Sequence, residues 1–288
     1  MKVNKLTLKS SVFPETLRAI PSPPKELFVI GAKLSKLLQR PRVAIVGSRK
    51  ISTYGRKITT KIAGELAEQG IVIVSGLALG VDAAAHQAAL DVGGQTIAVL
   101  PNGLDKVYPA SHTQLARRIL EQGGTLISEY PEGSVAFKQN FIARNRIVSG
   151  LADGLLITEA AEKSGSLHTA RFALEQGREV MAVPGNIDSL TSVGCNNLIK
   201  SGASPITSSE DVLNALGLVA RQDKDKPIPK GANANEQVII DLIVAGTYDG
   251  GQLLAKSKLE AAQFNQTMTM LEITGKIRAN GANQWSLR

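Results

Sequence analysis

The stretch RVAIVGSRKISTYG, residues 42–55, places an unbroken apolar run directly before a glycine, a serine and an arginine. A strand that is apolar at every position is buried on both faces, as strands are in parallel sheets covered by helices. Residues 56–69, which follow, are compatible with a helix, and Gly70 ends it. The stretch therefore predicts one strand–turn–helix unit of an α/β fold.

The same unit recurs along the chain. Further apolar strands are predicted at residues 71–74, 96–100, 125–127, 154–157 and 179–183. Helices are predicted between them at residues 82–90, 112–122 and 167–176, with Asp82 as the N-cap of the first. This alternation predicts a Rossmann-like, doubly wound, mainly parallel sheet. Such sheets bind ligands beyond the carboxyl ends of their strands, where the polar and glycine residues of this sequence gather.

The chain is expected to comprise four segments. Residues 1–38, with four prolines, form an N-terminal extension, and residues 39–218 form the Rossmann-like domain. The polar residues 219–234 form a linker. Residues 235–288 form a small C-terminal domain. It contains three helix-like stretches and a hairpin, which is typical of a winged helix, and the helices are predicted at residues 235–245, 250–257 and 259–273.

The charge of the chain suggests a polyanionic partner. Lys and Arg number 33 against 25 Asp and Glu, which gives a formal net charge of +8. A positive surface attracts phosphate, although such an excess can also serve solubility alone. Cys195 is the single cysteine, so neither an internal disulfide nor a cysteine zinc site can form. With no apolar leader and no uninterrupted apolar span, we expect a cytoplasmic protein without membrane insertion.

Three loops have the composition of phosphate sites. Each follows a predicted strand and precedes a helix, whose free backbone N–H groups and partial positive charge attract anions. The alternative for the first loop is a tight turn with a solvated arginine. The candidate residues are Gly47, Ser48 and Arg49 in the first loop, Ser75 and Gly76 in the second, and Ser164, Gly165 and Ser166 in the third.

Residues 138–146 combine cations, amides and an aromatic ring. Cations follow the phosphates of a nucleic-acid strand, amides read base edges, and an aromatic ring stacks on a base. The alternative is an amphipathic helix that buries Phe141 and leaves the charges in solvent. The candidate residues here are Lys138, Asn140, Phe141, Arg144 and Asn145.

No catalytic constellation emerges from the sequence. It contains three histidines and neither a Walker loop nor a G-x-G-x-x-G motif. His86 follows Asp82 by four residues, but a packed histidine is favoured over a metal ligand. Glu159 at a strand end could be a catalytic base, or equally a cap of the 164–166 turn or the partner of an arginine. We therefore expect a binding protein without a cofactor or metal, and not an enzyme.

Eight stretches, in this order, resemble the DprA/Smf family of DNA-processing proteins. The resemblance spans roughly residues 40–215, with Ile142 where family members often have proline. The matching stretches are VAIVGSRKISTYG (43–55), SGLALGVDAAAH (75–86), GLDKVYP (103–109), LISEYPEG (126–133), FIARNRI (141–147), TEAAEKSGSLHTA (158–170), AVPGN (182–186) and GCNNLIKSGA (194–203).

The resemblance implies a homodimer that binds single-stranded DNA and helps load the recombinase RecA during natural transformation. It implies that Arg49 and Lys138 are the principal DNA-binding cations and that Phe141, Arg144 and Asn145 face the strand. The three predicted loops would line a phosphate pocket.

Two other functions compete with this interpretation. A nucleotide-metabolising, phosphoribohydrolase-like enzyme has the same broad fold and would use Glu159 and residues 164–166. A transcription factor would bind duplex DNA through residues 259–273. That segment carries two glutamates and has one lysine beside it, which disfavours strong duplex binding.

Overall fold

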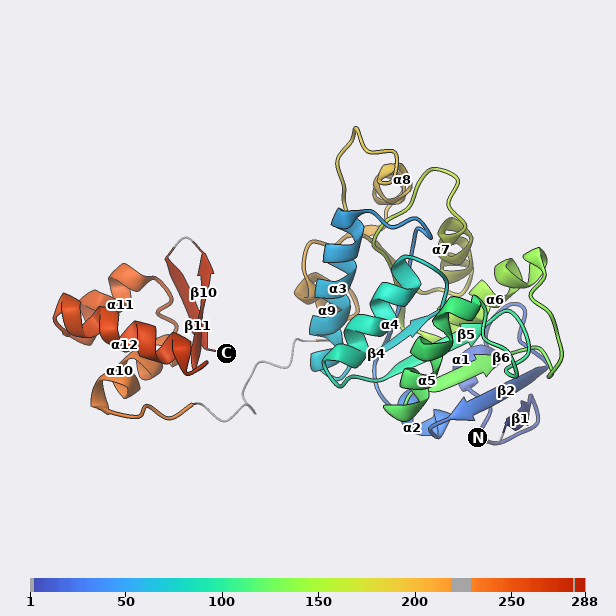
Figure 1. The fold of residues 1–288 in the computed structure, drawn as a ribbon. Coiled ribbons are helices and arrows are strands. Elements are labelled where there is room, and N and C mark those ends of the chain that lie inside the picture. Colours follow the sequence, from blue (N-terminus) through green and yellow to red (C-terminus); the bar gives the residue numbers. More distant parts are fainter. Residues whose placement is uncertain (1–2, 219–228, 282, 288) are drawn as a thin grey trace. The chain divides into compact units, whose positions relative to one another are not determined.

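The computed structural model describes residues 3–218, 229–281 and 283–287 and divides the chain into two compact units, Met1–Ala220 and Arg221–Arg288 (Figure 1). Residues 219–228 of the predicted linker lie outside the described residues. No helix in the described ranges has the length and apolar character needed to cross a bilayer.

The first unit is built on one twisted sheet. Within the described residues its strand order is β1-β2-β6-β5-β4-β3-β7-β8-β9. All neighbours from β6 to β9 pair in parallel, whereas β1 and β2 are antiparallel, which confirms the doubly wound, mainly parallel sheet. The strands are β1 (Asn4–Thr7), β2 (Glu26–Gly31), β3 (Arg42–Val46), β4 (Val72–Ser75), β5 (Thr96–Leu100), β6 (Thr125–Ser128), β7 (Gly154–Ile157), β8 (Glu179–Ala182) and β9 (Ser204–Pro205).

Helices cover both faces of this sheet. One buried cluster joins it to α1, α2, α6 and α7, and two others join its opposite face to α3, α4, α5 and α9. The sheet is therefore enclosed on both sides, which is why its strands are apolar throughout. The helices are α1 (Glu15–Arg18), α2 (Leu34–Leu38), α3 (Thr53–Glu68), α4 (Val81–Asp91), α5 (Thr113–Glu121), α6 (Lys138–Leu151), α7 (Ser166–Glu175), α8 (Val193–Lys200) and α9 (Ser209–Ala215).

The N-terminal extension predicted for residues 1–38 is not separate from the Rossmann-like unit. β2 pairs with β6 and continues the sheet, and Phe13 and Leu17 are buried in the cluster that contains α6. The predicted boundary at residue 39 therefore has no structural counterpart. Burial of these apolar residues and pairing of an otherwise open sheet edge explain why the segment joins the domain.

Asp82 does not cap α4 as the sequence predicted. The N-cap is Gly80, whose φ of +83° suits glycine, and Asp82 lies in the first turn of the helix. The Asp82 carboxylate instead accepts hydrogen bonds from the N–H groups of Gly76 (3.0 Å) and Ala78 (3.4 Å). It therefore fixes the loop after β4 rather than the helix end.

His86 is a packed core residue, as the sequence favoured. The Thr96 hydroxyl donates to the Ile73 carbonyl (2.6 Å), so the Nδ1–H of His86 must donate to Thr96 Oγ1 (2.6 Å). Its Nε2 is buried and has no hydrogen-bond partner within the described part of the chain. Burial holds the pKa of His86 at about 3, because a charged imidazole would lose its hydration there.

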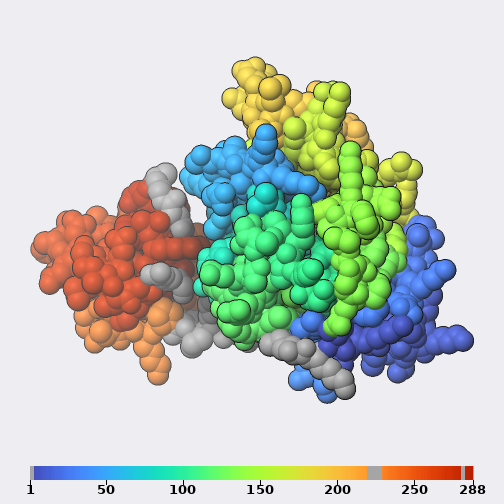
Figure 2. Space-filling model, turned by 45° about the vertical axis from the view of Figure 1, so that its right-hand side comes forward, coloured from blue at the N-terminus to red at the C-terminus, as the bar shows by residue number. Residues whose placement is uncertain are grey.

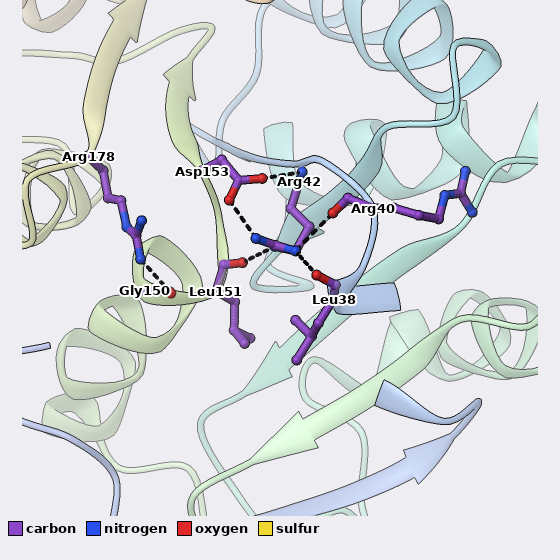
Figure 3. Close-up of polar contacts among 7 residues, drawn as sticks. All are labelled: Leu38, Arg40, Arg42, Gly150, Leu151, Asp153 and Arg178. Carbon is purple, nitrogen blue, oxygen red and sulfur yellow. Dashed lines mark hydrogen bonds and ion pairs between the residues drawn. The ribbon is translucent and has the colours of Figure 1, made fainter. Parts of the chain in front are cut away.

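Arg42 ties the amino-terminal edge of the sheet together (Figure 3). Its guanidinium donates to the backbone carbonyls of Leu38, Arg40 and Leu151 and pairs with Asp153 (2.5 Å). Leu38 and Leu151 are the last residues of α2 and α6, so the cation lies at two helix C-termini. The side chain of Arg42 is only 8% exposed, which makes these partners necessary.

The second unit contains the helices and hairpin expected from the sequence. They are α10 (Ala234–Val244), α11 (Gly250–Ser257), α12 (Ala261–Ile273), β10 (Ile277–Gly281) and β11 (Gln284–Leu287). The unit has its own apolar core, and Lys276 pairs with the buried Glu236 (2.7 Å). Its identification as a winged helix stays a prediction.

Arg42→Met should lower the free energy of unfolding by about 3 kcal/mol, since it leaves the Asp153 carboxylate and three backbone carbonyls without their cationic partner. Urea unfolding followed by circular dichroism measures this loss. The control is Arg171→Met, which removes an exposed pair with Glu175 and should cost about 0.5 kcal/mol or less. Equal losses in the two variants would contradict the role given to Arg42.

Acidification should destabilise the protein through His86. Between pH 6.5 and about 3, His86 is protonated in the unfolded state but stays neutral in the folded state. The free energy of unfolding therefore falls as pH falls, by up to ~1.4 kcal/mol per pH unit. From pH 7 to pH 5, the native protein should lose about 2 kcal/mol more than a His86→Gln variant. Replacing the exposed His168 by Gln should not change the loss. Identical pH profiles for the native protein and the His86 variant would refute this explanation.

Candidate nucleic-acid interface

The candidate residues gather at the carboxyl-terminal edge of the sheet. β3 pairs with β4 on one side and with β7 on the other, so the direction of winding reverses between β3 and β7. Ligands of doubly wound sheets bind at such a reversal, because the loops on its two sides diverge. The loops after β3, β4 and β7, each predicted from the sequence, therefore meet at one edge.

The loop after β3 is wedged between its two neighbours. Ser48 N–H donates to the Glu159 carbonyl (2.7 Å), and Val81 N–H donates to the Ser48 carbonyl (3.1 Å). A Cβ on Gly47 would lie 2.6 Å from the Glu159 carbonyl oxygen, and one on Gly80 would lie 2.1 Å from the Ser48 carbonyl oxygen. Both positions therefore require glycine, and the loop is held rigidly where it presents the next residue, Arg49.

Arg49 lies over an aromatic pair. Its guanidinium carbon is 5.0 Å from the centroid of the Phe141 ring, and Tyr108 meets Phe141 edge-on with 5.2 Å between ring centroids. Arg49 is exposed and has no carboxylate partner in the described ranges. A cation–π contact at an exposed site is weak, so the guanidinium keeps its donors for an incoming anion.

Lys138 is the first residue of α6, and it is exposed. The N-cap position before it is Phe137, whose side chain is 58% exposed, and the first turn contains no acidic residue. Phe141 follows Lys138 by three residues, so both lie on one side of the first turn. The structure thus brings Arg49, Lys138 and Phe141 to one end of α6.

Arg144 does not point into solvent, contrary to the expectation that it faces a strand. It is 3% exposed, and its guanidinium donates to the backbone carbonyls of Gly76 and Val99. Burial lowers the pKa of Arg144 to about 10, so it stays charged at neutral pH. Burial also raises the pKa of Asp82, and the positive charge of Arg144 opposes that rise. Arg144 therefore anchors α6 to the loop after β4.

Other candidate side chains are also turned inward. Ser75 is fully buried and its hydroxyl donates to the Ile45 carbonyl (2.6 Å). Asn140 is 7% exposed and its amide donates to the carbonyls of Pro101 (3.1 Å) and Val135 (3.3 Å). These two side chains shape loops. Gly76 is packed under the Arg144 guanidinium, and Asn145 accepts from Arg144 Nε (3.3 Å).

The loop after β7 forms a hydroxyl-lined turn. The hydroxyls of Ser164 and Ser166 lie 2.8 Å apart, and Gly165 between them is open to solvent. Ser166 itself is largely buried as the first residue of α7. The N–H groups of Ser164 and Ser166 donate within the turn, to the Ala161 carbonyl (3.0 Å) and the Ser164 hydroxyl (3.4 Å). The turn thus presents the exposed Gly165 at a helix start rather than two free hydroxyls.

Glu159 stabilises the start of α3. One carboxylate oxygen accepts from Ser52 N–H (2.8 Å), and Ser52 is the N-cap of the helix. The other oxygen is buried without a hydrogen-bond partner in the part of the chain that is described. Of the roles that the sequence left open, capping is the one observed, although at α3 rather than at the 164–166 turn.

Tyr108 and Phe137 were not singled out from the sequence. Tyr108 is 48% exposed and contacts Phe141, the ring that Arg49 lies over, and Phe137 directly precedes Lys138. The sequence indicated them only in that aromatic residues are rare in this chain and that these two lie in loops, outside any apolar pattern of a strand or helix.

Comparison with known proteins identifies a family and several relatives of this chain. The family model of DNA recombination-mediator protein A matches residues 4–217. The chain is 48% identical over 207 residues to protein Smf of Escherichia coli and 43% identical over 212 residues to DNA processing protein DprA of Streptococcus pneumoniae. These matches cover 72% and 74% of this chain, and 55% and 74% of the relatives. The chain thus spans only about half the length of the E. coli protein.

Solved structures agree as well. The X-ray structure of DprA from S. pneumoniae superposes with a TM-score of 0.69 at 42% identity, covering 74% of each chain. DNA processing protein A from Helicobacter pylori, described by its single-stranded DNA binding mode, has a TM-score of 0.66 at 36% identity, covering 74% of this chain and 95% of that one. The protein therefore belongs to the DNA recombination-mediator protein A family.

Proposed function

We propose that this protein binds single-stranded DNA, largely independently of base sequence, and acts as a binding protein rather than an enzyme. The observation that carries the proposal is the cluster of Arg49, Phe141 and Tyr108 near the start of α6, whose first residue is the exposed Lys138. Cations that hold phosphates and rings that stack on any base are the components of sequence-tolerant strand binding. The single-stranded DNA binding of the H. pylori relative supports it.

In this mechanism Arg49 and Lys138 bind phosphates. The backbone of Gly47, Ser48, Gly165 and Ser166 surrounds the same strand at two loop ends. Phe141 and Tyr108 stack on one or two bases. Ser75, Gly76, Asn140, Arg144 and Asn145, which the sequence placed at the interface, instead support it from below through the contacts described above.

The biological setting follows from the family. We propose that the bound strand is protected in the cytoplasm and passed to RecA during natural transformation and recombination, and that the protein acts as a homodimer. Membership in a family of recombination mediators supports this setting. The phosphoribohydrolase-like alternative is less well supported, because its presumed base, Glu159, is 3% exposed and engaged at the start of α3.

Arg49→Ala and Lys138→Ala should each weaken binding to an oligothymidylate by roughly 10- to 100-fold, because each removes charged hydrogen bonds to phosphate. Fluorescence anisotropy at two salt concentrations should also show a log–log salt slope reduced by about 0.7. Lys36→Ala, an exposed charge on α2, is the control and should bind normally. Normal binding by both interface variants, with unchanged melting temperatures, would rule out these roles.

Tyr108→Ala should weaken binding by about 1–3 kcal/mol, the contribution of one stacked base, whereas Tyr108→Phe should bind nearly as the native protein does. An oligonucleotide of abasic sugar-phosphate units distinguishes lost base stacking from altered loop structure, since it offers phosphates but no bases. The alanine variant should bind that ligand normally. Equal weakening on both ligands would show that Tyr108 acts through loop structure and not through stacking.

A further inference from the structure

The exposed side of α3 carries cations that the interface described above does not use. Arg56, Lys57 and Lys61 are all exposed, and none is paired with a carboxylate in the described parts of the chain. We call these three residues the α3 basic face. Lys57 and Lys61 are four residues apart, so they are neighbours on one side of the helix.

This arrangement opposes the electrostatics of the helix. The N-terminal end of a helix carries partial positive charge and favours acidic residues, yet α3 has none in its first turn. Its acidic residues, Glu65 and Glu68, lie instead at the C-terminal end, where cations are favoured. Two lysines four residues apart also repel each other. A carboxylate from outside the helix, Glu159, accepts from the N-cap Ser52, but the first turn of α3 supplies no acidic residue of its own beside these cations.

Some helices of the protein do follow the favourable rule. α1, α9 and α10 begin with acidic residues, and α1, α5 and α8 end with a cation. α7 carries Arg171 but pairs it with Glu175. α6, which has no acidic residue and begins with Lys138, shares the unfavourable arrangement with α3. Both helices begin at the carboxyl-terminal edge of the sheet, beside the candidate interface, although α2, α5, α7 and α8 also begin without an acidic residue.

The α3 basic face continues directly from that interface. The loop that presents Arg49 leads through the exposed Lys50 into α3. Figure 1 shows α3 running away from the carboxyl-terminal edge along the outside of the unit, and in Figure 2 its blue surface adjoins the yellow-green surface of the α6 region. A strand held at Arg49 can therefore pass onto this helix without crossing an acidic surface of the loop.

We propose that the α3 basic face binds the sugar-phosphate backbone of the same DNA strand where it extends beyond the Arg49–Phe141 stack. This inference rests on the proposed function and extends it to a second, backbone-only section of the binding path. Phosphates offset the repulsion between Lys57 and Lys61 and add to the negative charge that Glu159 already supplies at the N-cap Ser52. The three cations contact phosphates, whose charge is independent of base identity, and the nearby exposed Tyr54 is engaged through its hydroxyl with the Pro184 carbonyl (2.8 Å).

The test compares a short and a long ligand with a double variant of the full chain, Lys57→Gln/Lys61→Gln. A hexathymidylate fills the Arg49–Phe141 site alone, and its affinity should not change. An oligothymidylate of twenty nucleotides reaches α3, and its affinity should fall about tenfold, with a log–log salt slope smaller by about 1.4. The matched control, Lys33→Gln/Lys36→Gln, removes the same charge from exposed positions at α2 and should bind both ligands normally.

Three outcomes would overturn the inference. They are an unchanged affinity for the long ligand, an equal loss on both ligands, and an equal loss in the control variant, which would indicate net charge alone. If the native protein binds neither ligand, the proposed function fails and the inference fails with it. If it binds the short ligand and only the length dependence is missing, the proposed function stands and α3 is not part of the path.

Discussion

The Arg144 guanidinium, buried under the loop after β4, is the contact on which the whole carboxyl-terminal edge depends. A cation in the protein interior must find several acceptors, and Arg144 finds the backbone carbonyls of Gly76 and Val99, at the ends of β4 and β5. The Asp82 carboxylate accepts hydrogen bonds from the backbone N–H groups of Gly76 and Ala78 in the same loop. Its negative charge also stabilises the charged guanidinium of Arg144. α6 is thereby fixed against two strands, and its exposed first turn is presented in one orientation.

A second buried arginine performs the equivalent task at the opposite edge of the sheet. Arg42 gathers the last carbonyls of α2 and α6 together with Asp153 at the start of β7. α6 is therefore held at its C-terminus by Arg42 and within its N-terminal half by Arg144. With both points fixed, the exposed Lys138 and the half-buried Phe141 are held in place relative to Arg49. Such preorganisation favours the proposed binding of a polymer that has many conformations.

The candidate interface uses few polar side chains, because backbone hydrogen bonds hold most of its loops in place. Gly47 and Gly80 allow the loops after β3 and β4 to interlock through direct backbone hydrogen bonds. Few polar side chains then need to reach solvent, and those that do are cations and rings. Phosphate and a π-face occur at every nucleotide, so this combination fits the proposed binding of a nucleic-acid strand without reading its sequence.

The sequence by itself determined the sheet and the edge of it where the candidate residues lie. Apolar runs such as 43–46 can be buried only between two helix layers, and parallel strands necessarily bring their carboxyl-end loops together. Only the tertiary structure decided which charged residues face solvent: Arg49 and Arg144 look alike in sequence, but the acceptors of Arg144 are backbone carbonyls, which every residue type provides. For the same reason Asp82 could not be told from a helix cap. The contact of Tyr108 with Phe141 and the pairing of β2 with β6 likewise join residues 33 and about 100 positions apart, a proximity set by the folded chain and not by any local pattern.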